Sequence, residues 1–268
     1  MKVPPESYWA GLPLGRGVTV LARDPNGLAA LSKPVGVLSH PNSNKEEARA
    51  LLTAPYDFEA ECYEWQPSST EDTADKSNAP HRIWHLNRLD SATSGVILVA
   101  ADEALAATVR AQFKRKQVSK VYQALVFGKP KLASEIWRDR LDVKKSGGQI
   151  RIAPGHLPAE CRMTLLRPAG RDFGGQGPLP VSLLRLEPMT GRSHQLRGQC
   201  AKRGLPIVGD QTYGDFRRNR EFARASGSKR LFLHALETGF SYEFGGREFA
   251  FAARAPLPPE FEGGLEQA

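Results

Sequence analysis

Three short stretches of the sequence contain residue types whose spacing could support chemistry. The first is Asn87–Gly95, where an Arg and an Asp flank one Leu, and a Thr, a Ser and a Gly come shortly before an apolar run. A polar loop that runs into a rigid strand can hold a carboxylate in place, and such a carboxylate can act as a base or as a nucleophile. The same composition also suits an ordinary turn that leads into a strand, and the stretch taken alone favours that turn.

The second stretch is Met189–Arg197, with polar and basic groups at the start of an expected helix. Ser193 is a suitable N-cap, and the exposed backbone N–H groups at a helix start suit an anion. His194 and Arg197 are three residues apart and therefore share a helix face. A solvated basic helix explains this stretch equally well.

The third stretch is Lys120–Ala124, which has the alternation of a strand. Alternation places Lys120 and Tyr122 on the same face. A Tyr in this position usually packs in the core with its hydroxyl hydrogen-bonded. That remains the stronger interpretation until another feature points to the same face.

The hydrophobic pattern predicts the elements that must position these stretches. Turn residues at Asp24–Gly27 separate two apolar runs, Val18–Arg23 and Leu28–Lys33, and predict a β-hairpin. The continuous apolar run Val96–Ala100, directly after the first stretch, is typical of a strand buried on both faces. Good helix formers with acidic residues first and basic residues last predict a helix over Asp102–Lys116.

Strands outnumber helices in the rest of the sequence. A short helix is expected over His194–Arg203, because Gly204 can end it. Further strand-like runs are 118–127, 134–142, 148–153, 159–167, 180–187, 231–236 and 240–251. Because regular crossover helices do not separate these strands, the pattern favours an α+β fold with a largely antiparallel or mixed central sheet and flanking helices.

Composition excludes several classes of protein. The 268 residues are 40% hydrophobic and 25% charged, which rules out global disorder, and no apolar run reaches the ~18 residues of a membrane span. Cys62, Cys161 and Cys200 are too few and too far apart for a disulfide framework or a zinc site, and they suit a reducing cytoplasm. We therefore expect a cytoplasmic protein that depends on no metal and binds no membrane.

Charge is distributed unevenly along the chain. The formal net charge of +8 at pH 7 makes a polyanion such as RNA a candidate partner, although many basic proteins bind nothing acidic. Residues 57–76 hold seven acidic residues and one Lys, a charge of −6, so the remainder carries +14. We interpret 54–80 as an exposed acidic insertion that is partly disordered. Basic residues gather at 110–120 and 215–230, which suit either phosphate contacts or solvated segments.

In this order, the three stretches resemble the RluA-type family of pseudouridine synthases. The family signature has Arg-Leu-Asp, then after two residues Thr-Ser-Gly and an apolar strand, and Arg88–Gly95 matches it. A later block of Thr-Gly-Arg, a small hydroxyl residue, His-Gln, an aliphatic residue and Arg is matched throughout by Thr190–Arg197. Three flanking segments are also similar to those of the family: Lys33–Gly36, Gly204–Gly214 and Leu233–Ala235.

The resemblance implies that the chain isomerises uridine to pseudouridine within RNA, without a metal or cofactor. Asp90 would be the catalytic carboxylate, acting as a nucleophile or as a base toward a ribose proton. Arg197 resembles the Arg that pairs with this carboxylate and would lower its pKa. Tyr122 resembles the active-site Tyr that stacks on the uracil and helps to remove the C5 proton. Arg88 resembles the Arg that enters the base stack when the target nucleotide flips out.

The resemblance also implies how the RNA is held and how the chain is organised. Besides Arg88, the motif residues expected to contact RNA are Leu89, Thr93, Arg192, His194 and Gln195. The basic segments 110–120 and 215–230 add Lys120, Arg217 and Arg218 as expected RNA contacts. Phe216 and Phe222 could add stacking faces. We expect a single catalytic domain over residues 1–268 with a catalytic cleft and a core of about 18–255. No S4-like RNA-binding module is expected, because the early motif already begins at Lys33. The expected partner of this monomer is ribosomal or transfer RNA.

Two alternatives stay open on the sequence alone. Asn87 stands where the family usually has His. A protein that binds RNA on the same fold but has lost catalysis, for instance a ribosome-assembly factor, would therefore also fit. The presence of Asp90, Tyr122 and Arg197 counts against that alternative. An unrelated basic protein would require five ordered motif matches to be accidental.

Overall fold

The chain folds into two compact units. The described residues of the computed structural model are 4–67, 79–146, 149–168 and 180–266. Unit 1 comprises Met1–Val118 and Thr238–Ala255, and unit 2 comprises Ser119–Glu237 and Pro256–Ala268. Two structural units can still make one catalytic domain, so the expected domain organisation stays a prediction.

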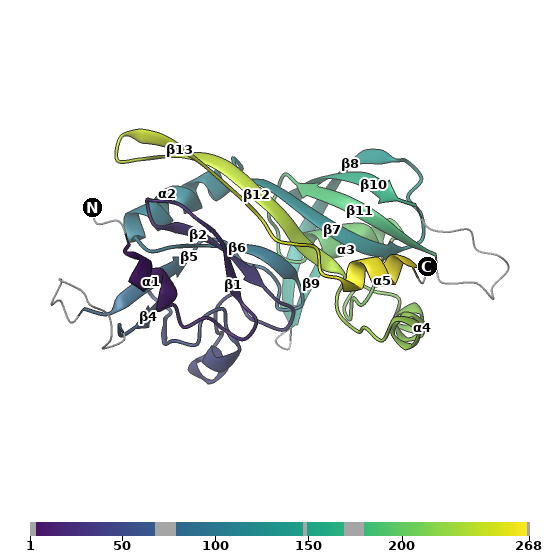
Figure 1. The fold of residues 1–268 in the computed structure, drawn as a ribbon. Coiled ribbons are helices and arrows are strands. Elements are labelled where there is room, and N and C mark those ends of the chain that lie inside the picture. Colours follow the sequence, from purple (N-terminus) through teal and green to yellow (C-terminus); the bar gives the residue numbers. More distant parts are fainter. Residues whose placement is uncertain (1–3, 68–78, 147–148, 169–179, 267–268) are drawn as a thin grey trace. The chain divides into compact units, whose positions relative to one another are not determined.

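Unit 1 combines short strands with a few helical segments (Figure 1). Its elements are α1 (Glu6–Ala10), β1 (Thr19–Arg23), β2 (Leu28–Lys33), the 3₁₀ helix η1 (Asn44–Arg49), β3 (Tyr56–Asp57), β4 (Cys62–Trp65), β5 (His81–His85), β6 (Ser94–Ala100), α2 (Glu103–Lys114) and β13 (Arg247–Arg254). β2 pairs antiparallel with both β1 and β6, and β3, β4, β5 and β6 follow one another in an antiparallel series. The strand β12 (Leu233–Phe244) belongs to unit 2 at its start and to unit 1 from Thr238 onward.

The β1–β2 hairpin forms as the turn residues predict. The Asp24 carboxylate accepts hydrogen bonds from the backbone N–H groups of Asn26 (2.9 Å) and Leu28 (3.0 Å). Gly27 has a φ of +97°, which a residue without a Cβ adopts at no steric cost. The hairpin places Lys33 at the end of β2, opposite Gly95 at the start of β6.

β6 and α2 also match their predictions. Every residue of β6 is buried, as expected of a strand covered on both faces. The Asp102 side chain caps α2 by accepting a hydrogen bond from the N–H of Leu105. Leu98 and Val109 from these two elements pack in one core cluster with Phe240 and Phe251. The strand that follows the Asp90 loop is therefore fixed in the unit's core.

The described part of unit 2 is a sheet with three helices. Its elements are β7 (Ser119–Phe127), β8 (Ser134–Ser146), β9 (Gln149–Pro154), β10 (Leu157–Arg167), β11 (Val181–Pro188), α3 (Gln195–Lys202), α4 (Phe216–Ser226) and α5 (Glu260–Glu266). The strand order is β12-β7-β11-β10-β8-β9, and the pairings from β7 to β9 are antiparallel. Phe127, Phe222, Phe232 and Phe261 form its aromatic core. The two units together confirm the predicted α+β class with a mixed central sheet.

The end of the sheet differs from its prediction. The pattern predicts separate strands at 231–236 and 240–251, but β12 runs without a break from Leu233 to Phe244. The chain reverses at Gly245 and Gly246, both with positive φ. Two successive residues in that conformation make a tight turn. The prediction missed this turn because apolar residues on both sides of it suggested one continuous strand.

The segment 54–80 also differs from its prediction as an exposed insertion. β3 and β4 pair within it, and the side chains of Tyr56, Cys62 and Tyr63 are buried. Acidic residues alternate there with buried apolar ones, so the composition alone suggested exposure. Residues 68–78 of the segment lie outside the described residues. Within the described part of the chain, no helix is long and apolar enough to cross a membrane.

Candidate active site

In unit 1 the loop that carries Asp90 connects β5 to β6 and is held by Ser39. The Ser39 hydroxyl accepts a hydrogen bond from the N–H of Leu89 and donates one to the carbonyl of the same residue, both at 2.9 Å. Asp90 closes a turn of its own, because its carbonyl accepts from the N–H of Thr93 at 2.9 Å. Ser39 is itself buried. The backbone on both sides of the Asp90 side chain is therefore fixed.

Lys33 holds the same loop from its other side. Its side chain is fully buried, and the ammonium donates to the carbonyls of Pro34 (3.0 Å), Val37 (2.7 Å) and Ser91 (3.1 Å). A buried ammonium is costly unless its protons are hydrogen-bonded, and these carbonyls supply acceptors. The N–H of Gly36 adds a bond of 2.7 Å to the Ser91 carbonyl. The Lys33–Gly36 motif thus ties the end of β2 to the residue after Asp90.

Replacing Lys33 should loosen this loop. Lys33→Met keeps the apolar stem but removes the buried donor to the Pro34 and Val37 carbonyls, while Ser91 keeps its bond from Gly36. Each unsatisfied buried polar group costs about 1–3 kcal/mol. Because the variant also removes a buried charge, we expect a net loss of about 2–4 kcal/mol in the free energy of unfolding. Urea denaturation measures it, with the exposed Lys45→Met as the matched control. Equal stability of the two variants would contradict the role of Lys33 in holding the Asp90 loop.

The loop's side chains differ in exposure. Arg88 is exposed and Asp90 is half-buried, whereas Leu89 and Thr93 are buried. The burial of these two favours a role in holding the loop over direct contact with a substrate. The Asn87 side chain accepts a hydrogen bond from the N–H of Leu98 at 2.8 Å and so ties the loop to β6.

The charge of Arg88 acts on the pKa values of three neighbouring rings, His40, Tyr56 and His85. His40 stacks on Tyr56 and on His85, with ring centroids 5.4 and 5.0 Å apart. Burial is the main cause that lowers the pKa of His85 to about 3, and the charges of His40, Arg110 and Arg88 lower it further. His85 is therefore neutral at physiological pH, and its Nδ1 lies 3.1 Å from the Tyr56 hydroxyl.

In unit 2, Arg197 projects from α3 into a buried hydrogen-bond network. Its Nε and Nη2 donate to the two oxygens of Asp210, each at 2.8 Å, and Nη2 also reaches the Thr212 hydroxyl at 3.1 Å. Its Cζ lies 5.4 Å from the centre of the Tyr213 ring. Both charged side chains are almost fully buried. The expected pairing of Arg197 with Asp90 would join residues of different units and stays a prediction.

Asp210 was not among the predicted site residues, although it carries the charge that holds Arg197. Burial alone would raise its pKa, but the hydrogen bonds and charge of Arg197 outweigh burial and leave the pKa below its usual range. The preceding Gly209 has a φ of +78°, and a Cβ there would lie 1.7 Å from the Arg230 carbonyl oxygen. The sequence signal was a lone acidic residue after an apolar run, which needs a buried cationic partner.

His194 lies at the start of α3 in a left-handed conformation, with a φ of +55°. The Tyr213 hydroxyl accepts from the N–H of Ile152 at 2.8 Å and lies 3.1 Å from His194 Nδ1, to which it can donate. A neutral His194 would then carry its proton on Nε2. Gly198 of α3 faces Ile152 so closely that a Cβ would overlap it, so β9 packs directly on this helix. The left-handed backbone of His194 is strained for a non-glycine residue, and strain of this kind is common at functional sites.

Gln195 is buried and fully engaged within unit 2. Its Oε1 accepts from the Thr190 hydroxyl (2.7 Å) and from the N–H of Arg192 (3.1 Å), and its Nε2 donates to the Glu160 carbonyl (3.1 Å). This favours a role in shaping the turn before α3. The expected N-cap Ser193 is wrong by one residue, because α3 begins at Gln195 and its cap position is His194.

Tyr122 and Lys120 lie on β7, half-buried. Burial lowers the pKa of Lys120, and its Nζ lies close to Gly191 in the turn before α3. Within unit 2, the third predicted stretch therefore lies beside the turn that contains the second. Arg217 and Arg218 lie on α4, a helix that the sequence pattern did not predict.

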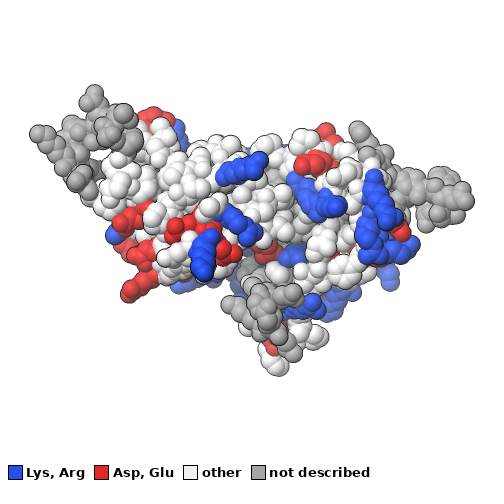
Figure 2. All heavy atoms as spheres, turned by 90° about the horizontal axis from the view of Figure 1, so that it is seen from below, with Lys and Arg blue, Asp and Glu red and all other residues white. Residues whose placement is uncertain are grey.

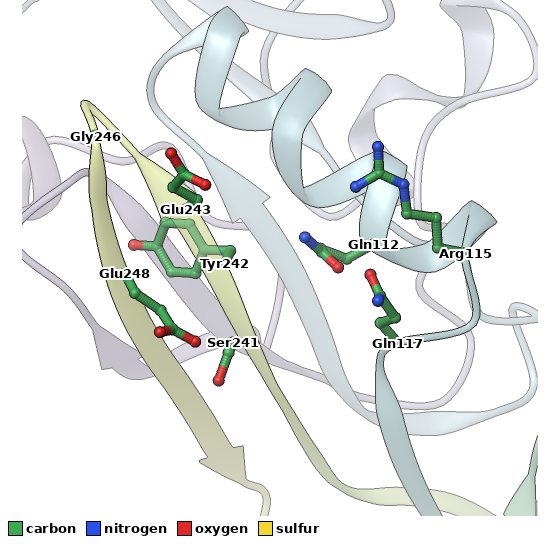
Figure 3. A pocket seen from close by; sticks show the side chains of 8 residues that line it. All are labelled: Gln112, Arg115, Gln117, Ser241, Tyr242, Glu243, Gly246 and Glu248. Carbon is green, nitrogen blue, oxygen red and sulfur yellow. The ribbon is translucent and has the colours of Figure 1, made fainter.

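A separate hollow of about 780 Å³ lies in unit 1 between the end of α2 and the β12–β13 hairpin. Figure 3 shows Arg115 and Gln117 near one side and Glu243 and Glu248 on the hairpin. None of the predicted site residues lines it. Despite its volume, this hollow is therefore not the candidate reaction site.

Comparisons with known proteins agree with the motifs. A family model described as RNA pseudouridylate synthase matches residues 27–202. The tRNA pseudouridine synthase C of Yersinia pestis is 32% identical over 184 residues, 66% of this chain and 70% of that protein. The ribosomal large subunit pseudouridine synthase C of Vibrio parahaemolyticus is 33% identical over 157 residues, 59% of this chain and 47% of that protein. This chain thus spans about half the length of that ribosomal relative.

Solved structures show the same fold. The human RNA pseudouridylate synthase domain containing 4 superposes with a TM-score of 0.64 at 20% identity, covering 93% of this chain and 92% of that one. At that level of identity, the likeness concerns the fold.

Proposed function

This chain belongs to the family of RNA pseudouridylate synthases, of the RluA type that its motifs resemble, and on this premise we propose that it isomerises specific uridines of ribosomal or transfer RNA. Membership confirms the predicted class of enzyme, an intramolecular isomerase. The observation that carries the proposal is the built loop around Asp90. Lys33 and Ser39 fix the backbone of a half-buried carboxylate at the position of the family's catalytic residue.

The reaction itself sets the demands on this site. The N1–C1′ bond breaks, the uracil turns, a C5–C1′ bond forms, the C5 proton leaves and N1 gains a proton. No electrons are gained or lost overall. Asp90 acts either by attacking the nucleotide or by taking a ribose proton, and either role needs its ionised form held in place. Tyr122 stacks on the uracil and helps to remove the C5 proton. By the family resemblance, Arg197 is the residue expected to orient this carboxylate, and within unit 2 its guanidinium is held by Asp210.

Transcripts from a strain that lacks the gene would test the proposed activity. Purified protein is incubated with total RNA from that strain, and pseudouridines are mapped by chemical modification and primer extension. We expect stops at one or a few uridines of ribosomal or transfer RNA that are absent without protein. RNA binding without any new stop would favour the alternative of an inactive RNA-binding protein.

Arg88 gives a test of target-base flipping. It is exposed on the Asp90 loop, and flipping a stacked uridine costs a few kcal/mol that an inserted side chain can offset. Arg88→Ala should therefore lower kcat/KM about 10- to 100-fold for a uridine in a paired context, and much less for the same uridine in an unpaired loop. Arg82→Ala, an exposed arginine of the same unit, is the control. Equal losses on both RNAs would remove the flipping role.

A further inference from the structure

Helix α4 of unit 2 has two unlike faces. One face is built into the unit: Phe222 is buried against the rings of Phe127 and Phe232, with centroids 6.2 and 5.3 Å away. Asn219 is also buried on this side. Arg218 is half-buried, pairs with Asp215 at 3.7 Å and lies over the Phe127 ring. Phe222, expected from the sequence to offer a stacking face, is therefore packed inside unit 2, whereas RNA contact by Arg218 stays a prediction.

The other face carries an exposed aromatic ring among arginines. Phe216 is 53% exposed, and Arg217, Arg220 and Arg224 are exposed as well. At 3.6 residues per turn, these four residues fall within about 100° of the helix circumference. We call them the α4 stripe. Figure 2 views the molecule from the side on which α4 lies and shows Lys and Arg side chains gathered over this part of unit 2.

The cations of the α4 stripe are open to an external anion. Within the described part of the chain, the ion pairs do not include Arg220 or Arg224. Arg217 pairs with Glu221 at 3.0 Å, but its side chain is 71% exposed, and such surface pairs contribute little. A solvated charged helix would not need an exposed Phe at its first turn. An aromatic ring beside arginines is the combination that single-stranded nucleic acids stack on and bind.

We propose that the α4 stripe binds a single-stranded segment of the substrate RNA, with an unpaired base on Phe216 and phosphates on Arg217, Arg220 and Arg224. This proposal rests on the proposed function. It adds the place where the RNA substrate is bound and the single-stranded state in which it is bound. A fully paired RNA would offer phosphates but no free base face.

The buried face of α4 connects the stripe to the Arg197 network. The Asn219 side chain accepts from the N–H of Gly209 at 2.7 Å and donates to the carbonyl of Asp210 at 2.9 Å. Asp210 in turn holds Arg197. Within unit 2 the stripe is therefore held by the same residues that fix Arg197, so RNA bound on α4 has a defined place relative to it.

Binding measurements on two RNAs test the proposal. The probes are a stem-loop RNA with an unpaired pyrimidine loop and a blunt duplex of the same length. Phe216→Ala should weaken Kd for the stem-loop about 5- to 100-fold, as expected for one lost base stack, and leave the duplex unaffected. Phe216→Tyr should bind both RNAs like the wild type, because it keeps the ring.

The arginines are tested by salt dependence. The double variant Arg220→Ala with Arg224→Ala should reduce the slope of log Kd against log salt by about 1.4 for single-stranded RNA, about 0.7 for each lost phosphate contact. The corresponding lysine variant should keep the slope. Arg247→Ala, which removes an exposed arginine of β13 in unit 1, is the matched control and should change neither Kd nor slope.

The proposal would be overturned if both the Phe216→Ala and the double arginine variants kept the wild-type stem-loop affinity and salt slope. An acidic protein would then be the remaining candidate to bind the stripe. An equal loss by Phe216→Ala on duplex and stem-loop would overturn the stacking role. Pseudouridine mapping on transcripts keeps the two proposals apart. If the wild type modifies RNA while the stripe variants bind and react like it, only the stripe proposal fails.

Discussion

Asp90→Asn is expected to lower pseudouridine formation by about 10³-fold or more while RNA binding and stability stay close to those of the wild type. The substitution keeps the shape of the side chain but removes the negative charge that attacks or takes a proton. The loop should persist, because its fixing bonds come from Lys33 and Ser39 and involve backbone groups. Single-turnover assays with excess enzyme measure the chemical step directly.

A matched control separates this effect from a general loss of charge. Glu59→Gln removes an exposed carboxylate of the same unit and should leave the rate within about twofold of the wild type. RNA affinity of both variants, measured by filter binding, should be unchanged. An Asp90→Asn enzyme with at least a tenth of the wild-type rate would mean that another group does the chemistry.

Arg197→Met should be among the most destabilising substitutions in unit 2, because it leaves the Asp210 carboxylate buried without its cation. Breaking a buried ion pair from one side costs about 3–5 kcal/mol. The double variant Arg197→Met with Asp210→Asn should recover part of this loss, since no uncompensated charge remains. Urea denaturation of the two single variants and the double variant measures the coupling.

An exposed ion pair provides the comparison for that cycle. Glu6 pairs with Arg23 at 3.0 Å, but the Glu6 side chain is 80% exposed. Glu6→Gln should therefore change stability by less than about 1 kcal/mol. A loss for Arg197→Met no larger than this would contradict the buried network.

The same pair predicts how stability depends on pH. The folded pKa of Asp210 lies below its unfolded value of about 3.9, so its contribution is complete above that pH and is lost as the pH falls toward the folded pKa. Asp139, whose pKa is lowered by Lys202, Gln199 and Arg203 against the effect of burial, acts in the same direction. Below about pH 4, stability should therefore fall more steeply with acid in the wild type than in Asp210→Asn.

Local signals predicted a large part of the fold. The β1–β2 turn, the buried strand β6 and the capped helix α2 each follow from residues that lie next to one another in the sequence. These features need no knowledge of distant partners. In unit 2, Lys120 of the third stretch lies close to Gly191 of the second.

Features that depend on contacts between distant residues could not be predicted from the sequence. The α4 segment has only two aromatic residues among its charges, and which of them is buried depends on the rings of Phe127 and Phe232. Its Asp215 cap and the Gly227 that ends it were the available local signals. Asp210 as the partner of Arg197, and Lys33 as a clamp on the Asp90 loop, become visible only when the chain is folded.

The central claim is that this chain isomerises uridine in RNA through Asp90. The most direct measurement is the release of tritium from RNA labelled at C5 of uridine, because the C5 proton leaves only when C5 joins the ribose. We predict release by the wild type that reaches the number of modified sites, and none above background by Asp90→Asn. No release by a wild-type protein that binds the RNA, or equal release by both proteins, would contradict the claim.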